Sequence, residues 1–93
     1  MIILLFAAKL AFKILLMPKQ LNLYSTSHCH LCELAYDILV KMQNDITVNV
    51  IEITENEALF SNYGMRIPVL ARQDTRAELN WPFSEIDIRE LLK

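Results

Sequence analysis

The chain of 93 residues is poor in glycine and cysteine and has no excess of positive charge. One glycine and three prolines exclude collagen and low-complexity chains, and 54% hydrophobic residues exclude charge-driven disorder. Nine Lys and Arg against eleven Asp and Glu leave a net charge of −2, with no basic stripe to hold phosphates. We therefore expect one small domain that does not bind nucleic acid.

The hydrophobic residues are concentrated at the N-terminus. Residues 1–17 contain 15 of the 50 apolar residues, and the other 76 residues contain 35, an ordinary globular share. This apolar N-terminal extension is shorter than the roughly 20 residues of a membrane span, and it lacks the basic start of a signal peptide. Three interpretations stay open: Met17 is the true start, residues 1–16 lie on a membrane, or they pack on the domain. We expect a cytoplasmic location.

Residues 18–93 are predicted to form one domain with the element order β-α-β-α-β-β-α. Strands are expected where β-branched or alternating apolar residues occur, and helices where apolar residues recur every three or four positions. The predicted strands cover 20–25, 46–53, 67–72 and a return strand from Ala77, and the predicted helices cover 30–43, 55–62 and the segment after Ser84. This order predicts an α/β fold, α+β in some classifications, with a four-stranded mixed sheet and flanking helices. Its first two strands should be parallel through a right-handed crossover.

Polar residues and the one glycine predict where the helices begin and end. The expected N-terminal caps, in chain order, are Thr26 or Ser27, Thr54 with Glu57 as a capping box, and Ser84 with Asp87. Gly64 should end the middle helix in a left-handed conformation, which glycine adopts without steric cost.

Cys29 and Cys32 are the only cysteines, and they stand at the start of the first predicted helix. A disulfide between them closes almost no loop, so it would add little stability by the chain-entropy argument. A thiol at a helix N-terminus faces unpaired backbone N–H groups and the positive end of the helix dipole, which should lower the pKa of Cys29. Cys32, one turn further on, should be more buried and able to attack a mixed disulfide on Cys29. We predict these two cysteines as the catalytic residues.

His28 and His30 flank Cys29 and are predicted to modulate it, since a protonated imidazole would favour the thiolate. The alternative is that both are solvated loop residues. Together with the cysteines they are also candidate zinc ligands, but such close neighbours cannot easily surround a tetrahedral ion, and the chain has no other Cys or His. We therefore expect neither a metal site within one chain nor a tightly bound cofactor.

Three segments, LYSTSHCHLCELAYDIL, RIPVL and ELNWPFSEIDIRELL, resemble the small bacterial glutaredoxin-like proteins of the thioredoxin-fold superfamily. The resemblance covers about residues 20–93 and implies a thioredoxin-like fold, thiol–disulfide oxidoreductase activity and a role in redox homeostasis. It also implies that the Ile67–Pro68 bond is cis and faces the cysteines, with Ile67 and Pro68 binding an extended substrate. A trans proline that merely begins a strand is the alternative.

The sequence departs from ordinary glutaredoxins, which have Cys-Pro-Tyr-Cys and a Gly-Gly-Asp stretch that helps to hold glutathione. Here His30 and Leu31 separate the cysteines, and no Gly-Gly follows Pro68. Glutathione is thus a candidate co-substrate whose usual motif is absent. The expected partner of the monomer is a disulfide-containing protein or a glutathione mixed disulfide. Two other functions stay open: a metal or iron–sulfur module using Cys29, and a redox-inert interaction domain tethered to membrane by residues 1–16.

Overall fold

The computed structural model describes residues 18–93, and the apolar N-terminal extension with its three interpretations lies outside that range. Within it the element order is β-α-β-α-β-β-α, as predicted. The elements are β1 (Lys19–Ser25), α2 (His30–Val40), β2 (Ile46–Glu52), α3 (Glu57–Tyr63), β3 (Val69–Arg72), β4 (Glu78–Asn80) and α4 (Glu85–Leu91). The longest of these helices, α2, has 11 residues, and none between residues 18 and 93 could cross a membrane.

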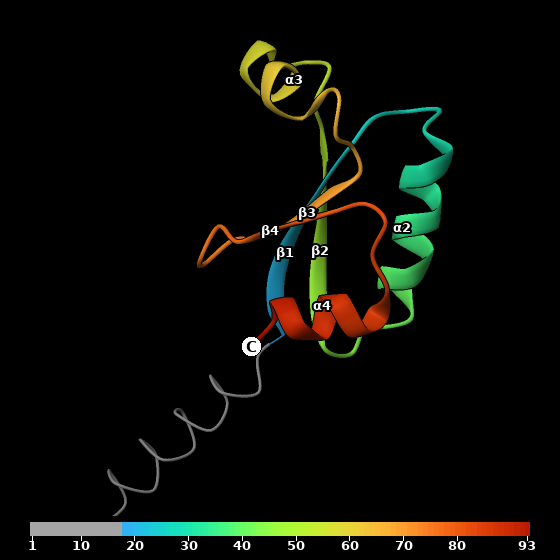
Figure 1. Ribbon diagram of the computed structural model, residues 1–93, viewed down its shortest axis with the longest axis vertical. Coiled ribbons are helices and arrows are strands. Elements are labelled where there is room, and N and C mark those ends of the chain that lie inside the picture. The colour runs from blue at the N-terminus through green and yellow to red at the C-terminus, as the bar shows by residue number, and fades with distance from the viewer. Residues whose placement is uncertain (1–17) are drawn as a thin grey trace, which may run out of the picture.

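The four strands form one mixed sheet in the order β2-β1-β3-β4 (Figure 1). β1 and β2 are parallel, from the Lys19–Ile46 pair to the Ser25–Glu52 pair, as the predicted crossover requires. β3 is antiparallel to β1, and β4 is antiparallel to β3. The predicted sheet is therefore confirmed, and its inner strand β1 delivers the chain directly to the loop that carries the cysteines.

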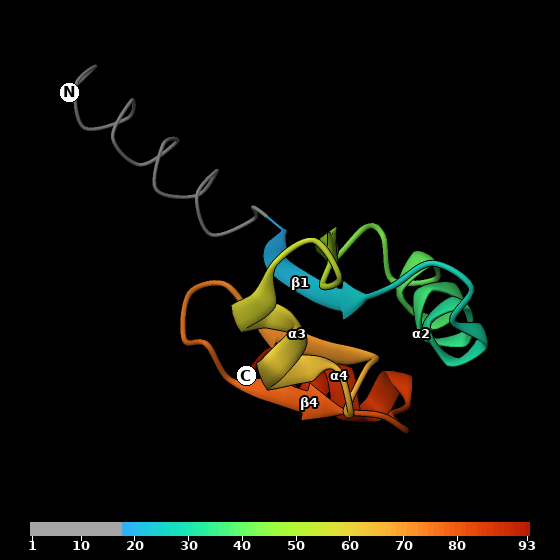
Figure 2. The same cartoon turned by 90° about the horizontal axis from the view of Figure 1, so that it is seen from above.

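Two groups of buried side chains lie on opposite faces of the sheet. The main core packs α2 and α4 against one face, and it consists of Leu21, Leu23, Ala35, Leu39, Met42, Ile46, Leu70, Phe83 and Ile88. A smaller cluster packs α3 against the other face, where Ile53, Tyr63 and Val69 are buried. Accordingly, α3 stands apart from α2 in both views (Figures 1 and 2). Leu23 and Tyr24 point to opposite faces because successive side chains alternate along a strand.

The ends of the helices confirm one predicted cap and contradict another. Ser84 caps α4 in a capping box, in which Oγ accepts from the Asp87 N–H at 3.3 Å and the Ser84 N–H donates to Asp87 Oδ2 at 2.8 Å. Helix α3 is capped by Asn56, whose Oδ1 accepts from the Leu59 N–H at 3.0 Å. The Thr54 cap was therefore wrong, because the Thr54 hydroxyl instead donates to Glu52 Oε2 at 3.0 Å.

Gly64 ends α3 without the left-handed conformation that the sequence predicted. Its φ is −53°, in the right-handed region, and its N–H donates to the Phe60 carbonyl at 2.8 Å. The helix runs into a further turn, in which the Tyr63 carbonyl accepts from Arg66 and Ile67. Glycine suits this position because it has no Cβ. A Cβ there would lie 2.6 Å from the Phe60 carbonyl oxygen, which is too close.

Candidate functional site

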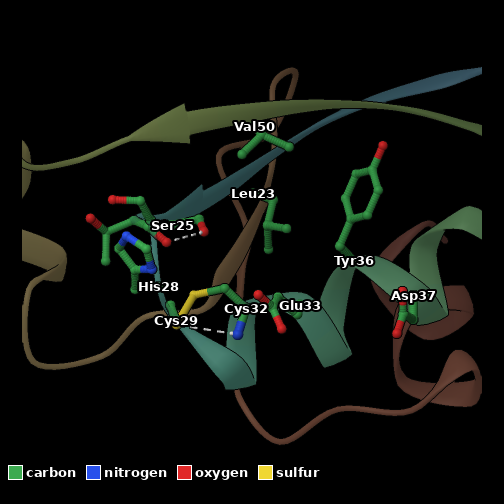
Figure 3. A pocket seen from close by; sticks show the side chains of 11 residues that line it. Leu23, Ser25, His28, Cys29, Cys32, Glu33, Tyr36, Asp37 and Val50 are labelled. Carbon is green, nitrogen blue, oxygen red and sulfur yellow. Dashed lines mark hydrogen bonds between the residues drawn. A yellow bond between two sulfur atoms is a disulfide. The ribbon is translucent and has the colours of Figure 1, made fainter.

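Cys29 and Cys32 lie at the N-terminus of α2 and are joined by a disulfide, with their Cα atoms 5.2 Å apart (Figure 3). Cys29 is the N-cap residue, and its Sγ accepts a 3.2 Å hydrogen bond from the Cys32 backbone N–H. The predicted cap by Thr26 or Ser27 was wrong because this sulfur holds the capping position. Cys32 is 4% exposed while Cys29 is partly exposed, so the predicted order of accessibility is confirmed.

The loop between β1 and α2 is held in place by Glu52 at the end of β2. Glu52 Oε1 accepts from the Ser27 N–H at 3.3 Å, and Oε2 accepts from the Thr54 N–H at 3.1 Å. The Thr54 hydrogen bond is the main reason why the pKa of Glu52 lies below its ordinary value. His28 then turns the chain into the helix with a φ of 58°, a left-handed conformation that histidine adopts more readily than most residues.

A cavity of about 390 Å³ opens beside the disulfide. Its walls come from β1, the loop, the first two turns of α2 and β2, and they are formed by Leu23, Ser25, Thr26, Ser27, His28, Cys29, Cys32, Glu33, Tyr36, Asp37 and Val50. Figure 3 shows His28 and the cysteine pair on one side of this group and Tyr36 and Asp37 on the other. The reactive sulfurs therefore border a space large enough for a substrate side chain.

The structure brings together some of the sequence-predicted site residues. His28, Cys29 and Cys32 all line the cavity, whereas His30, Ile67 and Pro68 do not. The His30 side chain is 80% exposed, and its Nδ1 lies 3.8 Å from Glu33 Oε2. His30 therefore lies next to Glu33 but does not line the cavity.

The cavity walls include two acidic residues of α2 that the sequence analysis did not assign to the site. Glu33 and Asp37 follow Cys29 by four and eight positions, so all three share one face of α2. Tyr36 follows Cys32 by four positions on the same face. The spacing of Cys29, Glu33 and Asp37 in the sequence indicates that they share a helix face. A search for hydrophobic periodicity does not detect this, because it does not follow charged residues.

The Ile67–Pro68 bond is cis, as the family resemblance implied, and the Trp81–Pro82 bond is also cis. Pro68 is almost fully buried and comes directly before Val69, which pairs with Tyr24 in the β1–β3 ladder. This register puts Pro68 next to the end of β1. The cysteine loop follows the last residue of β1, and the Ile67–Pro68 step precedes the first residue of β3, so the two lie at the same end of the sheet.

A polar and aromatic cluster joins β1, α3 and β4 on the α3 side of the sheet. The rings of Tyr24 and Tyr63 stack with centroids 3.9 Å apart, and the Tyr63 hydroxyl donates to Glu78 Oε2 at 2.7 Å. Burial, followed by this hydrogen bond, raises the pKa of Tyr63. Arg66 lies over the Tyr63 ring and pairs with Glu78 at 3.3 Å. The positive charge on this side of the site is therefore matched by a carboxylate.

Convergent metal ligands are not found in the described part of the chain. Between residues 18 and 93, no three His, Cys, Asp or Glu side chains come together as they would around an ion.

A mixed sheet whose first strand leads to a disulfide at a helix N-terminus defines a thioredoxin-like fold. Residues 20–93 match the family model described as "Glutaredoxin-like domain (DUF836)", and the chain belongs to this family. The class inferred from the sequence is thereby confirmed.

Solved structures agree with this assignment. An X-ray structure of target protein XcR50 from X. campestris is 36% identical, with a TM-score of 0.69 over 77% of this chain and 93% of that one. A solution NMR structure of protein Ne2328 from Nitrosomonas europaea is 33% identical, with a TM-score of 0.68 over 80% of this chain and 89% of that one. No curated protein gave a significant match.

Proposed function

We propose that the chain is a thiol–disulfide oxidoreductase in which Cys29 is the attacking residue and Cys32 the resolving residue. The observation that carries this proposal is the position of Cys29 Sγ, which caps α2 and accepts the Cys32 N–H at 3.2 Å. In the reduced protein the same N–H and the helix dipole would favour a thiolate at Cys29. Cys32 is buried beneath it and cannot easily reach an external disulfide first.

The proposed exchange has two steps. The Cys29 thiolate attacks one sulfur of the substrate disulfide, forms a mixed disulfide and releases the other sulfur as a thiolate. Cys32 then loses its proton and attacks Cys29 Sγ, which forms the Cys29–Cys32 disulfide and releases the second substrate thiolate. The protein dithiol is oxidised by two electrons, and the substrate disulfide is reduced. An external thiol reductant must return the protein to its dithiol form.

The neighbouring residues have supporting roles in this proposal. His28, in the cavity wall beside Cys29, adds positive charge when it is protonated, and so does His30, which lies next to Glu33. The Ile67 N–H already donates to the Tyr63 carbonyl, so in this proposal the Ile67 carbonyl, before Pro68, accepts from the backbone of an extended substrate. The protein would act as a cytoplasmic monomer without a tightly bound cofactor, on a protein disulfide or a glutathione mixed disulfide.

A single-turnover reaction tests the activity without any added reductant. The reduced protein is mixed with bis(2-hydroxyethyl) disulfide, a neutral substrate, and thiol release and the protein mass are followed. Wild type should consume one equivalent of disulfide, release two thiols and end as the Cys29–Cys32 disulfide. Cys29→Ser should release no more thiol than a protein-free control. Wild type that behaves like Cys29→Ser would overturn the proposal.

A further inference from the structure

Two carboxylates, Glu33 and Asp37, are the only acidic side chains among the residues that line the cavity, and no Lys or Arg is among those residues. Both lie on the face of α2 that carries Cys29, and Figure 3 shows them following the cysteines along that helix. The Glu33 side chain is 72% exposed, so its charge is available to a ligand that enters from solvent. With histidine counted as neutral, the cavity walls carry two negative charges.

The chain around the cavity also lacks cations. Residues 20–40 and 42–65 contain no Lys or Arg, and Lys41 lies at the opposite end of α2 from the cysteines. A third carboxylate, Glu52, accepts the Ser27 N–H directly behind the loop. Arg66 belongs to the α3 side, where it pairs with Glu78. Among the side chains that line the cavity, carboxylates are therefore present and Lys and Arg are not.

The cavity combines these charges with an apolar floor. Leu23 and Cys32 are buried beneath it, and Val50 closes the wall on the β2 side. A substrate with a short hydrocarbon arm ending in an ammonium or guanidinium group would match this arrangement, with the arm on the floor and the cation beside Glu33 or Asp37. A substrate carboxylate in the same place would meet like charge.

We propose that this cavity selects disulfides that carry positive charge close to the sulfur and disfavours anionic ones. The inference rests on the proposed function, because the cavity matters only if Cys29 reacts with substrate. It names the substrate class as cationic disulfides, such as small aminothiol disulfides or cystines next to Lys or Arg in a protein. Glutathione disulfide, which is dianionic, belongs to the disfavoured class.

The test compares single-turnover rates of the reduced protein with three disulfides of different charge. These are cystamine (dicationic), bis(2-hydroxyethyl) disulfide (neutral) and glutathione disulfide (dianionic). Leaving-group pKa also affects exchange rates, so each rate is divided by the rate of the same disulfide with dithiothreitol. At low ionic strength the normalised rate should be about tenfold higher for cystamine than for the neutral disulfide, and several-fold lower for glutathione disulfide. Sodium chloride at about 0.5 M should remove most of this difference.

Matched variants assign the preference to the cavity. Glu33→Gln and Asp37→Asn should each reduce the ratio of the cystamine rate to the neutral-disulfide rate about two- to threefold. Glu90→Gln makes the same change in net charge on α4, away from the cavity, and should leave the preference unchanged. Equal normalised rates, or a preference that survives both cavity variants, would overturn this inference alone. Failure to react with any of the three disulfides would overturn the proposed function as well.

Discussion

The backbone N–H of Cys32 donates a 3.2 Å hydrogen bond to Sγ of Cys29, so one sulfur both caps α2 and forms half of the disulfide. An N-cap is normally an oxygen of Ser, Thr, Asp or Asn. Here the sulfur replaces it, so a first-turn N–H of the helix points at the atom that we propose to attack as a thiolate. The beginning of the helix and the proposed chemistry therefore depend on the same contact.

Replacing the resolving cysteine should trap the mixed disulfide. In Cys32→Ser the Cys29 thiolate can still attack, but the second step has no nucleophile, so the adduct should accumulate. Mass spectrometry after mixing reduced Cys32→Ser with bis(2-hydroxyethyl) disulfide should show one added mercaptoethanol group on Cys29. Cys29→Ser is the control, since its remaining thiol is buried in the wild-type structure and should be modified much more slowly. Equal adduct formation by both variants would contradict the assigned roles.

Docking of α4 on the sheet should depend on Ile88 and not on its neighbour Ile86. Ile88 is 0% exposed within the main core, whereas Ile86 on the same helix is 79% exposed. Ile88→Ala should lower the free energy of unfolding by about 2–5 kcal/mol, because it removes buried methyl groups and leaves a cavity. Ile86→Ala should change it by roughly 0.5 kcal/mol or less. Urea unfolding measures both, and similar losses would argue against the packing described.

The capping box of α4 should contribute measurably to stability. Ser84→Ala removes the hydroxyl that accepts the Asp87 N–H, and it should cost about 1 kcal/mol in the free energy of unfolding. Ser61→Ala removes the same hydroxyl inside α3, where alanine is the better helix former, and should cost nothing. A loss in Ser61→Ala equal to that in Ser84→Ala would rule out capping as the cause.

The Arg72–Asp74 pair should make stability depend on acid pH. Arg72 is nearly buried and donates to Asp74 at 2.6 and 2.8 Å, which holds the pKa of that carboxyl well below its ordinary value. Because the folded pKa is the lower one, the pair stabilises the fold above the unfolded pKa of about 4 and loses this effect as pH falls further. Asp74→Asn should therefore lower Tm at pH 7, and its difference from wild type should shrink below about pH 4.

The control for that measurement is Asp45→Asn. Asp45 pairs with Arg89 at 3.4 Å, and both side chains are about half exposed, so solvent screens the pair. Its loss should lower Tm at pH 7 by less than Asp74→Asn does. A constant difference between Asp74→Asn and wild type from pH 7 down to pH 2 would show that Asp74 does not act through its charge.

The order of elements was predictable because each strand and helix shows its own period in the sequence. The parallel β1–β2 pair follows from a strand–helix–strand order, and Ser84 with Asp87 has the spacing of a capping box. The details that failed depend on competing local hydrogen bonds. Thr54 bonds Glu52, so Asn56 caps α3 instead, and nothing in the spacing separates these two outcomes.

The sequence indicated three residues of the cavity wall, which are His28 and the two cysteines. The placement of the cysteines after a strand and before an amphipathic helix was visible in the sequence, and the disulfide joins the same pair. The cavity was not visible, because it is built from α2, β1 and β2 together. The stacking of Tyr24 on Tyr63 joins two elements far apart in sequence, which no local pattern encodes.

The reactivity of Cys29 as a function of pH tests the central claim most directly. The reduced protein is alkylated with iodoacetamide from pH 4 to pH 10, and Cys29 and Cys32 are quantified separately by peptide mass. The account predicts that Cys29 reacts faster, with a midpoint well below the value of about 8.5 for a free thiol. A Cys29 midpoint at or above that value, or faster modification of Cys32, would contradict it.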